Sequence, residues 1–282
     1  MKHPLVSVVI PAYNHEKYIE RSLDSVATQD YPVKEIIVID DGSSDDTKSK
    51  IENWIHKNQH SIKIIFRTQQ NAGIATTLNR LLKLASGDYI SLSSSDDYLL
   101  PRSLSLRINM LEKSTKKAVF GDCLVVDGND ETIHESSVSG LYDGDKNLLQ
   151  SDENIKSQIL RNYFVAGPSL LFHRSLISSI GNFNSNLLVE DWDFCLNLAV
   201  NCELAFLDEI VAVYRLHQSN TINRENSLMD GLTYEESIYK KYIGYFDGND
   251  LKFINRRLRR IAFKKFKVSF HLRFASLLRR IL

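Results

Sequence analysis

Long hydrophobic runs are missing from this chain of 282 residues, although 43% of its residues are hydrophobic. No stretch reaches the roughly 18 consecutive apolar residues that a transmembrane helix needs. The N-terminal sequence MKHPLVSVVIPAY also lacks the charged segment and long apolar segment of a secretory signal. The composition is that of a globular protein able to bury a sizeable core, and we expect it to stay in the cytoplasm.

Cysteine is scarce as well, with three residues in the whole chain. Cys123, Cys195 and Cys202 are odd in number, lack the spacing of zinc ligands and stand among apolar neighbours. The sequence therefore predicts reduced, buried thiols and excludes a disulfide framework.

Glycine-rich phosphate loops are the third absence. No GxGxxG follows the first predicted strand and no GxxxxGK[ST] occurs, which excludes a dinucleotide fingerprint and a P-loop. A nucleotidyltransferase, which normally needs a basic, glycine-rich triphosphate loop, is disfavoured for the same reason.

The formal net charge is zero, but residues 247–282 hold 11 Lys and Arg against 2 Asp and Glu. The rest of the chain is correspondingly acidic, which argues against nucleic-acid binding. The basic tail by contrast predicts an anionic partner for that segment alone.

Short apolar, β-branched runs alternate with segments of helical periodicity. Strands are expected at Leu5–Pro11, Glu35–Asp40, Ile62–Phe66, Tyr89–Ser93, Ala118–Val126, Val165–His173 and Ile210–Tyr214. Helices are expected at His15–Gln29, through Ile51 and Trp54, at Thr76–Ala85, after Pro101 and from Glu190. This alternation predicts an α/β fold with a mostly parallel sheet flanked by helices.

Polar residues follow four of these strands, at what would be one edge of the sheet. They are Tyr13 and Asn14, Asp40 and Asp41, Asn71 and Gly73, and Asp96 and Asp97. Each acidic turn could simply cap the following helix. Two such turns in one sheet instead favour a ligand site, and acidic residues around a phosphate-bearing ligand require a divalent cation between them.

In family order, six segments resemble the nucleotide-sugar glycosyltransferases of family 2, which have the GT-A (Rossmann-like) fold. They are VSVVIPAYN (6–14), VIDDGSSDDT (38–47), NAGIATTLN (71–79), SGDYISLSSSDDYLLP (86–101), EDWDFCLNLA (190–199) and YRLHQSNT (214–221). The resemblance implies a GT-A domain over 1–225, followed by a helical C-terminal extension over 226–282.

The resemblance also implies which residues bind the donor. In the family, the residue matching Tyr13 stacks on the nucleobase and the one matching Asp41 contacts the base edge. The implied donor-binding set is Pro11, Tyr13, Asp41, Asn71, Ser95 and Asp96.

Mn²⁺ or Mg²⁺ is the implied cofactor, with Asp96 and His217 as its protein ligands. Family members commonly carry Asp-x-Asp-Asp where this chain has SSDD, so Ser94 replaces the first Asp. Metal binding is expected to survive on Asp96, although it is weakened. A lone histidine such as His217 can also be a structural hydrogen-bonding residue.

Glu190 and Asp191 open a predicted helix, where acidic residues often only offset the helix dipole. Inverting transfer from a nucleotide diphosphate needs one base, which deprotonates the acceptor hydroxyl. The resemblance assigns that role to Asp191 and an orienting, acceptor-contacting role to Glu190.

The implied activity is inverting transfer of a sugar from a nucleotide-diphosphate donor, with UDP the expected nucleotide, to a hydroxyl of a cell-surface or capsular glycan. The acceptor is a glycan or a lipid-linked glycan. A non-catalytic sugar-nucleotide-binding or scaffold subunit stays open because of Ser94.

Aromatic and aliphatic residues recur at three- and four-residue steps in the basic tail. They are Phe263, Phe266, Phe270, Phe274, Leu277, Leu278 and Ile281. Such a helix packs on the protein or lies on an anionic membrane surface. The second alternative predicts peripheral association with the inner face of the plasma membrane.

Overall fold

The structure is a computed structural model that describes residues 4–58, 62–187, 190–217 and 228–281, with side chains described up to residue 268 in the last helix. The chain divides into two compact units. The first holds Met1–Asn186 and Glu190–Gln218, and the second holds Leu187–Val189 and Ser219–Leu282. The domain boundary predicted at residue 225 lies outside the described residues.

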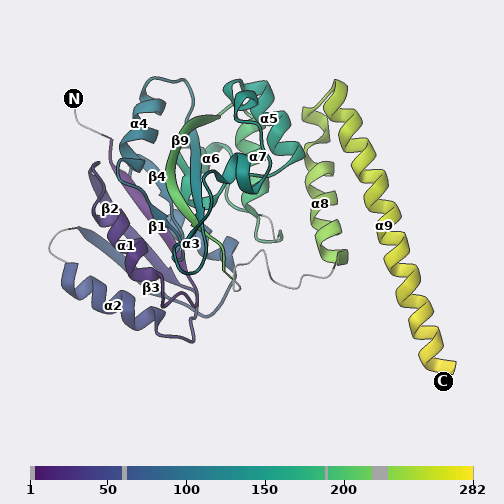
Figure 1. Cartoon of the computed structure of the whole chain (residues 1–282), viewed down its shortest axis with the longest axis horizontal. Helices are drawn as coiled ribbons and strands as arrows, with labels where there is room; N and C mark the ends of the chain where they lie inside the picture. Colours follow the sequence, from purple (N-terminus) through teal and green to yellow (C-terminus); the bar gives the residue numbers. More distant parts are fainter. Residues whose placement is uncertain (1–3, 59–61, 188–189, 218–227, 282) are drawn as a thin grey trace. The chain divides into compact units, whose positions relative to one another are not determined.

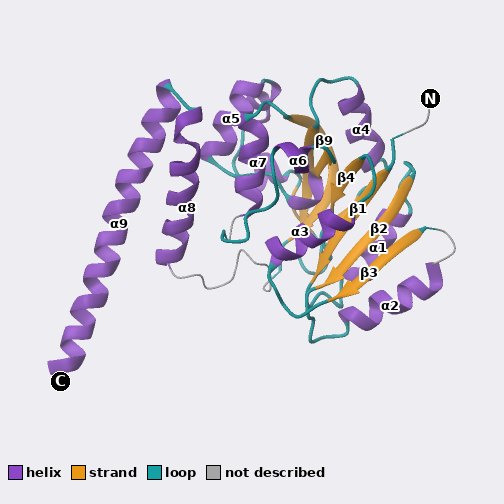
Figure 2. Ribbon diagram, turned by 180° about the vertical axis from the view of Figure 1, so that it is seen from behind, coloured by secondary structure: helices purple, strands orange, loops and turns teal. Residues whose placement is uncertain are grey.

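Nine strands of the described residues form one sheet in the first unit (Figures 1 and 2). They are β1 (Val6–Ala12), β2 (Val33–Asp40), β3 (Lys63–Thr68), β4 (Tyr89–Leu92), β5 (Tyr98–Leu99), β6 (Ala118–Val126), β7 (Thr132–His134), β8 (Leu170–His173) and β9 (Leu204–Arg215). The order is β3-β2-β1-β4-β8-β6-β9-β5, with β7 on β6.

The first four strands in this order are mutually parallel. Strand β8 then enters antiparallel between β4 and β6, whereas β9 is parallel to β6. The predicted mostly parallel sheet flanked by helices is therefore confirmed.

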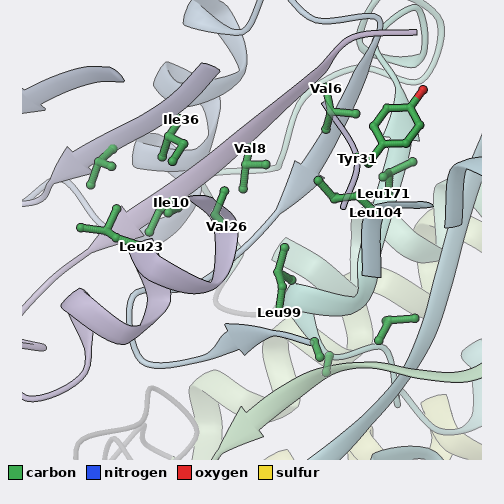
Figure 3. Packing of buried hydrophobic residues seen from close by; sticks show 14 of the residues in the cluster. Val6, Val8, Ile10, Leu23, Val26, Tyr31, Ile36, Leu99, Leu104 and Leu171 are labelled. Atoms are coloured by element: carbon green, nitrogen blue, oxygen red, sulfur yellow. The ribbon is translucent and has the colours of Figure 1, made fainter. Parts of the chain in front are cut away.

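Alternating residues of the central strands build the main core (Figure 3). Val6, Val8 and Ile10 of β1 lie in one cluster with Leu23 and Val26 of helix α1, because successive strand side chains point to opposite faces. All five are fully buried. This packing fixes the position of β1 against α1, and therefore the position of the turn that follows β1.

Helices cover both faces of the sheet, α1 and α2 on one side and α3 on the other (Figures 1 and 2). In the first unit they are α1 (Ile19–Ala27), α2 (Thr47–Asn58), α3 (Ile74–Leu84), α4 (Ser103–Glu112), α5 (Asp152–Arg161), α6 (Leu176–Ser179) and α7 (Glu190–Val200). Shorter turns are η1 (Ser137–Leu141), η2 (Lys146–Gln150) and η3 (Gly167–Ser169).

Three predicted elements are shorter than expected. The helix predicted over His15–Gln29 spans only Ile19–Ala27. The strand predicted over Val165–His173 is a strand only from Leu170, because Gly167–Ser169 forms a 3₁₀ turn that contains Pro168. The helix predicted to begin at Pro101 starts at Ser103, after the short strand β5. Asp97 is therefore too far from α4 to cap it.

The prediction of three buried thiols is wrong for one residue. Cys123 and Cys195 are buried, but Cys202 is exposed. Cys202 has a φ of 56° in the turn between α7 and β9, which leaves its side chain outside the apolar interior.

The second unit contains α8 (Leu228–Tyr242), a 3₁₀ turn η5 (Ile243–Tyr245) and α9 (Gly248–Ile281). Ile254 and Ile261 of α9 are buried, whereas Phe263 and Phe266 are 59% and 67% exposed. The side chains of Phe270, Phe274, Leu277, Leu278 and Ile281 lie outside the described part. None of the helices in the described part of the chain combines the length and apolar character that crossing a membrane requires.

Candidate active site

The turns after β1 and β2 are bound to each other. Asn14, at a φ of 55°, donates its backbone N–H to Ser43 Oγ at 2.9 Å. Its side-chain oxygen accepts from the Ser44 N–H at 2.8 Å. The two predicted strand ends therefore meet, as expected from a parallel sheet.

Asp41 joins the second turn to the third. Its carboxylate accepts from the backbone N–H groups of Ala72 at 2.8 Å and Gly73 at 3.0 Å, directly before α3. Gln69 Nε2 donates to it as well, at 2.7 Å. Asp41 is 5% exposed, so this carboxylate stabilises the turn whatever else it contacts.

The other residues predicted for donor binding lie along this edge. Pro11 and Tyr13 are half-buried at the end of β1 and beyond it, and Asn71 is exposed before α3. Gly42, at a φ of 78°, packs so closely on the third turn that an added Cβ would lie 2.9 Å from the Asn71 nitrogen. Only glycine fits there, which keeps Asp41 and Asn71 side by side.

Asp96 follows β4 and faces two imidazole rings. His217 Nε2 lies 3.1 Å from Asp96 Oδ2, and His15 Nε2 lies 3.7 Å from the same oxygen. Burial would raise the pKa of Asp96, but the His217 hydrogen bond and the charges of His15 and His217 bring it below its ordinary value. Asp96 is thus held in its anionic form.

The neighbouring Asp97 behaves in the opposite way. Burial, and then the charge of Asp96, raise its pKa well above the ordinary value. Hydrogen bonds from the Arg215 N–H, at 2.8 Å, and from the Ser94 hydroxyl oppose this shift. Ser94 therefore supports Asp97 and adds no carboxylate to the site.

Neither Ser95 nor Asp97 caps helix α4. The alternative that this acidic turn only caps the following helix is therefore removed. Ser95 is buried and its hydroxyl is hydrogen-bonded to His15 Nδ1 at 2.7 Å. The first turn of α4 is instead served by Gln29, whose Oε1 accepts from the Leu104 N–H at 3.1 Å.

Arg215, which the sequence analysis did not single out, fixes the motif from β9. Its Nε donates to the Asp96 carbonyl oxygen at 2.9 Å, and its Nη1 donates to the Asp127 carbonyl oxygen at 2.9 Å. A third bond, at 2.7 Å, joins Nη2 to the Asp130 carboxylate. A fully buried guanidinium thus ties the turn after β4 to the loop that follows β6.

The second acidic pair opens α7. Asp191 Oδ1 accepts from the Trp192 N–H at 2.8 Å, and the Tyr163 hydroxyl donates to the same carboxylate. Burial raises the pKa of Asp191, with these bonds opposing the shift. Burial and the charge of Asp191 raise the pKa of Glu190 to about 8.

Glu190 Oε2 is buried without a hydrogen-bond partner among the described residues. Leaving a polar atom unpaired in this way is costly unless a ligand or water satisfies it. Helix-dipole compensation alone does not explain this arrangement, because the dipole provides no hydrogen-bond partner for Glu190 Oε2.

Two tyrosines that are electrostatically linked to the acidic residues were also missed. The hydroxyls of Tyr142 and Tyr214 are hydrogen-bonded to each other. Burial raises the pKa of Tyr142 to about 12, the Tyr214 bond opposes this shift, and the charges of Asp191 and Asp97 add to it. Tyr142 is therefore within electrostatic range of both pairs.

A divalent cation fits the group formed by Asp96 and the two histidines that face it. One ligand atom each from His15, Asp96 and His217 can be chosen so that all three lie within 4.8 Å of one another. An anionic carboxylate beside two imidazoles is a donor set that proteins use for Mn²⁺ and its neighbours in the first transition row. The predicted ligands Asp96 and His217 are brought together, and His15 joins them.

The family model "Glycosyl transferase family 2" matches residues 7–181, which include the turns after β1, β2 and β4 described above. The chain belongs to glycosyl transferase family 2. The predicted family is thereby confirmed.

Curated relatives of this family 2 chain are glycosyltransferases by name. An uncharacterized glycosyltransferase of Rickettsia typhi is 30% identical over 223 residues, which cover 78% of this chain and 66% of the relative. The GalNAc(5)-diNAcBac-PP-undecaprenol beta-1,3-glucosyltransferase of Campylobacter jejuni is 27% identical, with 86% and 72% covered. The chain thus spans just under two thirds of the Rickettsia relative.

Solved structures of similar fold are glycosyltransferases of the GT-A type, as predicted. S. aureus TarS in complex with UDP-GlcNAc superposes with a TM-score of 0.67 at 22% identity, covering 91% of this chain and 71% of that one. The mannosyltransferase PcManGT of Pyrobaculum calidifontis, in complex with GDP-Man and Mn2+, gives 0.64 at 19% identity, with 99% and 79% covered. At these identities the likeness is one of fold.

Proposed function

We propose that this family 2 member is an inverting, metal-dependent glycosyltransferase that moves a sugar from a UDP-sugar to a hydroxyl of a cell-surface or capsular glycan. The observation that carries this proposal is the pairing of two differently tuned acidic sites. The first site is Asp96, which is held anionic beside two imidazoles. The second site is Asp191 with Glu190, whose pKa values are raised, and Tyr142 is within electrostatic range of both sites.

The donor occupies the strand-end edge in this proposal. Tyr13 stacks on the nucleobase, Asp41 contacts the base edge, and Pro11 and Asn71 line the nucleoside. Ser95 and Asp96 face the diphosphate. Asp96 and His217 hold Mn²⁺ or Mg²⁺, which when bound neutralises charge on the leaving diphosphate.

Asp191 is the base that removes the proton from the acceptor hydroxyl. Its raised pKa suits this role, because a base accepts a proton most effectively when its pKa lies near the working pH. A pKa of about 8 keeps Glu190 protonated at neutral pH, so that the negative charge of the pair rests on Asp191. Glu190 Oε2, unpaired in the described structure, then orients the acceptor.

Two comparisons support the substrate classes. TarS was solved with UDP-GlcNAc and PcManGT with GDP-Man, which supports a nucleotide-diphosphate-sugar donor as a class. UDP is the nucleotide that the resemblance in sequence implies. The name of the Campylobacter relative specifies a glycan on PP-undecaprenol, which favours a lipid-linked glycan acceptor here.

Transfer of radiolabelled sugar tests the proposal directly. A panel of UDP- and GDP-sugars with Mn²⁺ is first screened by thermal shift, because a bound donor stabilises the fold. The stabilising donor is then incubated with lipid-linked glycan acceptors. Donor binding with neither transfer nor donor hydrolysis would instead identify a non-catalytic sugar-nucleotide-binding subunit.

Helix α9 is proposed to place the enzyme at the inner face of the plasma membrane. Some of its cations are engaged within the second unit, since Arg257 donates to Glu235 at 2.8 Å and Lys265 pairs with Glu236 at 2.5 Å. Exposed Phe263 and Phe266 stand among further lysines, a combination that binds anionic bilayers.

Liposome sedimentation tests this placement with the full chain. We expect capture by anionic liposomes at low salt, and weaker capture after the double change Phe263→Ser and Phe266→Ser. Neutral liposomes are the control. Equal sedimentation of both proteins with anionic liposomes, or none of either, would favour a helix that only packs within the protein.

A further inference from the structure

We propose that His15 is a third protein ligand of the divalent cation, so that the site consists of two imidazoles and one carboxylate. This inference rests on the proposed function, because it concerns the same cation. It adds a ligand from the turn that follows β1, and it predicts which metal ions the site prefers.

The backbone of His15 is fixed from both sides. Its carbonyl oxygen accepts from the N–H groups of Tyr18 and Ile19, both at 3.0 Å, where α1 begins. Its own N–H donates to Thr47 Oγ1 at 2.8 Å, at the start of α2. The side chain therefore projects from a rigid turn, which is what a preorganised metal ligand requires.

Ser95 orients the ring of His15. With Nδ1 hydrogen-bonded to Ser95 Oγ at 2.7 Å, Nε2 is the nitrogen that faces Asp96. Metal-binding histidines are typically oriented in this way, by a hydrogen bond on the nitrogen that does not bind the metal. Ser95 is buried, so water competes little for this bond.

Two imidazole nitrogens converge on one carboxylate oxygen. Asp96 Oδ2 is 3.1 Å from His217 Nε2 and 3.7 Å from His15 Nε2, and the second distance is too long for a hydrogen bond. Ligand atoms about 2.1 Å from a shared cation are about 3 to 3.5 Å apart. The two distances to Asp96 Oδ2 therefore need little change to enclose a metal ion, and all three ligand atoms can be chosen within 4.8 Å of one another.

The strand-end motif itself supplies few ligands. Asp97 accepts from the Arg215 N–H and from the Ser94 hydroxyl, which leaves Asp96 as the carboxylate that meets both rings. His15 thus provides the ligand that a second carboxylate would otherwise provide. Because Mg²⁺ prefers oxygen ligands and imidazole suits transition metals, we expect Mn²⁺ or Co²⁺ to bind more tightly than Mg²⁺.

Counting the nitrogen ligands of bound Mn²⁺ tests this inference without measuring activity. Pulsed electron paramagnetic resonance of the full chain with MnCl₂, alone and with UDP, should show ¹⁴N couplings from two imidazoles. His15→Gln should show one and lower the Mn²⁺ affinity by about 10- to 100-fold. His173→Gln is the matched control, since His173 contacts Ser175 and Tyr89, and it should keep both couplings.

A second variant separates loss of a ligand from loss of structure. His15→Glu replaces the nitrogen ligand with a carboxylate, so we expect Mn²⁺ affinity to recover while the second ¹⁴N coupling stays absent and the preference for Mn²⁺ over Mg²⁺ falls. One imidazole coupling in the unaltered protein, or two in His15→Gln, would overturn the assignment of His15 and leave the proposed function standing. No Mn²⁺ binding even with UDP would overturn both.

Discussion

The two acidic pairs of the site are alike in sequence but differ in one carboxyl group, that of Asp96. Asp96 and Asp97 follow a strand, and Glu190 and Asp191 open a helix. The pKa of Asp96 is lowered, whereas the pKa values of Asp97, Glu190 and Asp191 are all raised.

The surroundings of each pair explain the contrast. Two imidazoles face Asp96, and the His217 hydrogen bond together with the charges of both rings outweighs the effect of burial on its pKa. At the start of α7, burial is the largest effect on both residues, and the Tyr163 hydroxyl and backbone N–H groups only partly oppose it. Asp96 is therefore suited to hold a cation and the pair at the start of α7 to exchange a proton, a difference set by neighbours distant in sequence.

The largest expected effect comes from the cation end. Asp96→Ala removes the carboxylate that faces both imidazoles, so we expect Mn²⁺-dependent binding of UDP to weaken by about 10²-fold or more. Calorimetric titration of UDP with Mn²⁺ and with EDTA measures this. Unchanged affinity in both conditions would show that the cation binds elsewhere.

A second large effect is expected at the proton-exchange end. Asp191→Asn keeps the size of the side chain but cannot accept the acceptor proton, so sugar transfer should fall by about 10² to 10⁴ while donor affinity stays the same. Single-turnover transfer and donor titration on the same protein separate the two quantities. Near-normal transfer would exclude Asp191 as the base, and lost donor binding would point to a structural role.

A smaller effect concerns the stability of the fold. The pKa of Glu190 is raised from 4.5 to about 8, so between these values the folded chain holds a proton that the unfolded chain has lost. This contribution is complete below pH 4.5 and disappears as the pH rises through 8.

Glu190→Gln removes this titration. Over pH 5 to 9, the stability measured by thermal unfolding should therefore fall less in Glu190→Gln than in the unaltered protein, by on the order of 4 kcal/mol. Asp193→Asn, one position beyond Trp192 on the same helix, is the matched control. Parallel curves for the unaltered protein and Glu190→Gln would contradict a raised pKa.

The smallest effect is expected at Ser94. Ser94→Ala removes the hydroxyl that donates to Asp97 and leaves Asp96 in place, so Mn²⁺ affinity should change by less than about threefold. The titration used for Asp96→Ala measures it. A loss as large as that of Asp96→Ala would make Ser94 itself part of the cation site.

Local patterns were enough to predict the parallel half of the sheet. Runs such as LVSVVIP and EIIVID are β-branched, short and buried, and they became β1 and β2. The two-residue strand β5 was missed, and the strand that became β8 was predicted to begin at Val165 instead of Leu170. The pairing partners of these strands, β9 and β4, lie far away in sequence.

The same limit applies to the site. The sequence motifs that resemble the family include Asp96, Asp191 and His217. The structure places Asp96 and His217 in contact. Arg215 was missed because the carbonyl it binds is 119 residues away, and Tyr142 because it lies in a polar stretch without periodicity. His15 directly follows Asn14, the last residue of the first motif. It was missed because its ring is oriented by the Ser95 hydroxyl, which is 80 residues away in sequence.

The most direct test of the division between the two pairs is an infrared titration of the carboxyl groups with and without Mn²⁺. We predict a protonated carboxyl band at neutral pH that titrates near pH 8, is absent in Glu190→Gln and is unchanged when Mn²⁺ binds. The carboxylate bands that respond to Mn²⁺ should instead disappear in Asp96→Asn. A band of Glu190 that is lost on addition of Mn²⁺ would contradict the account, because it would place the cation at the start of α7.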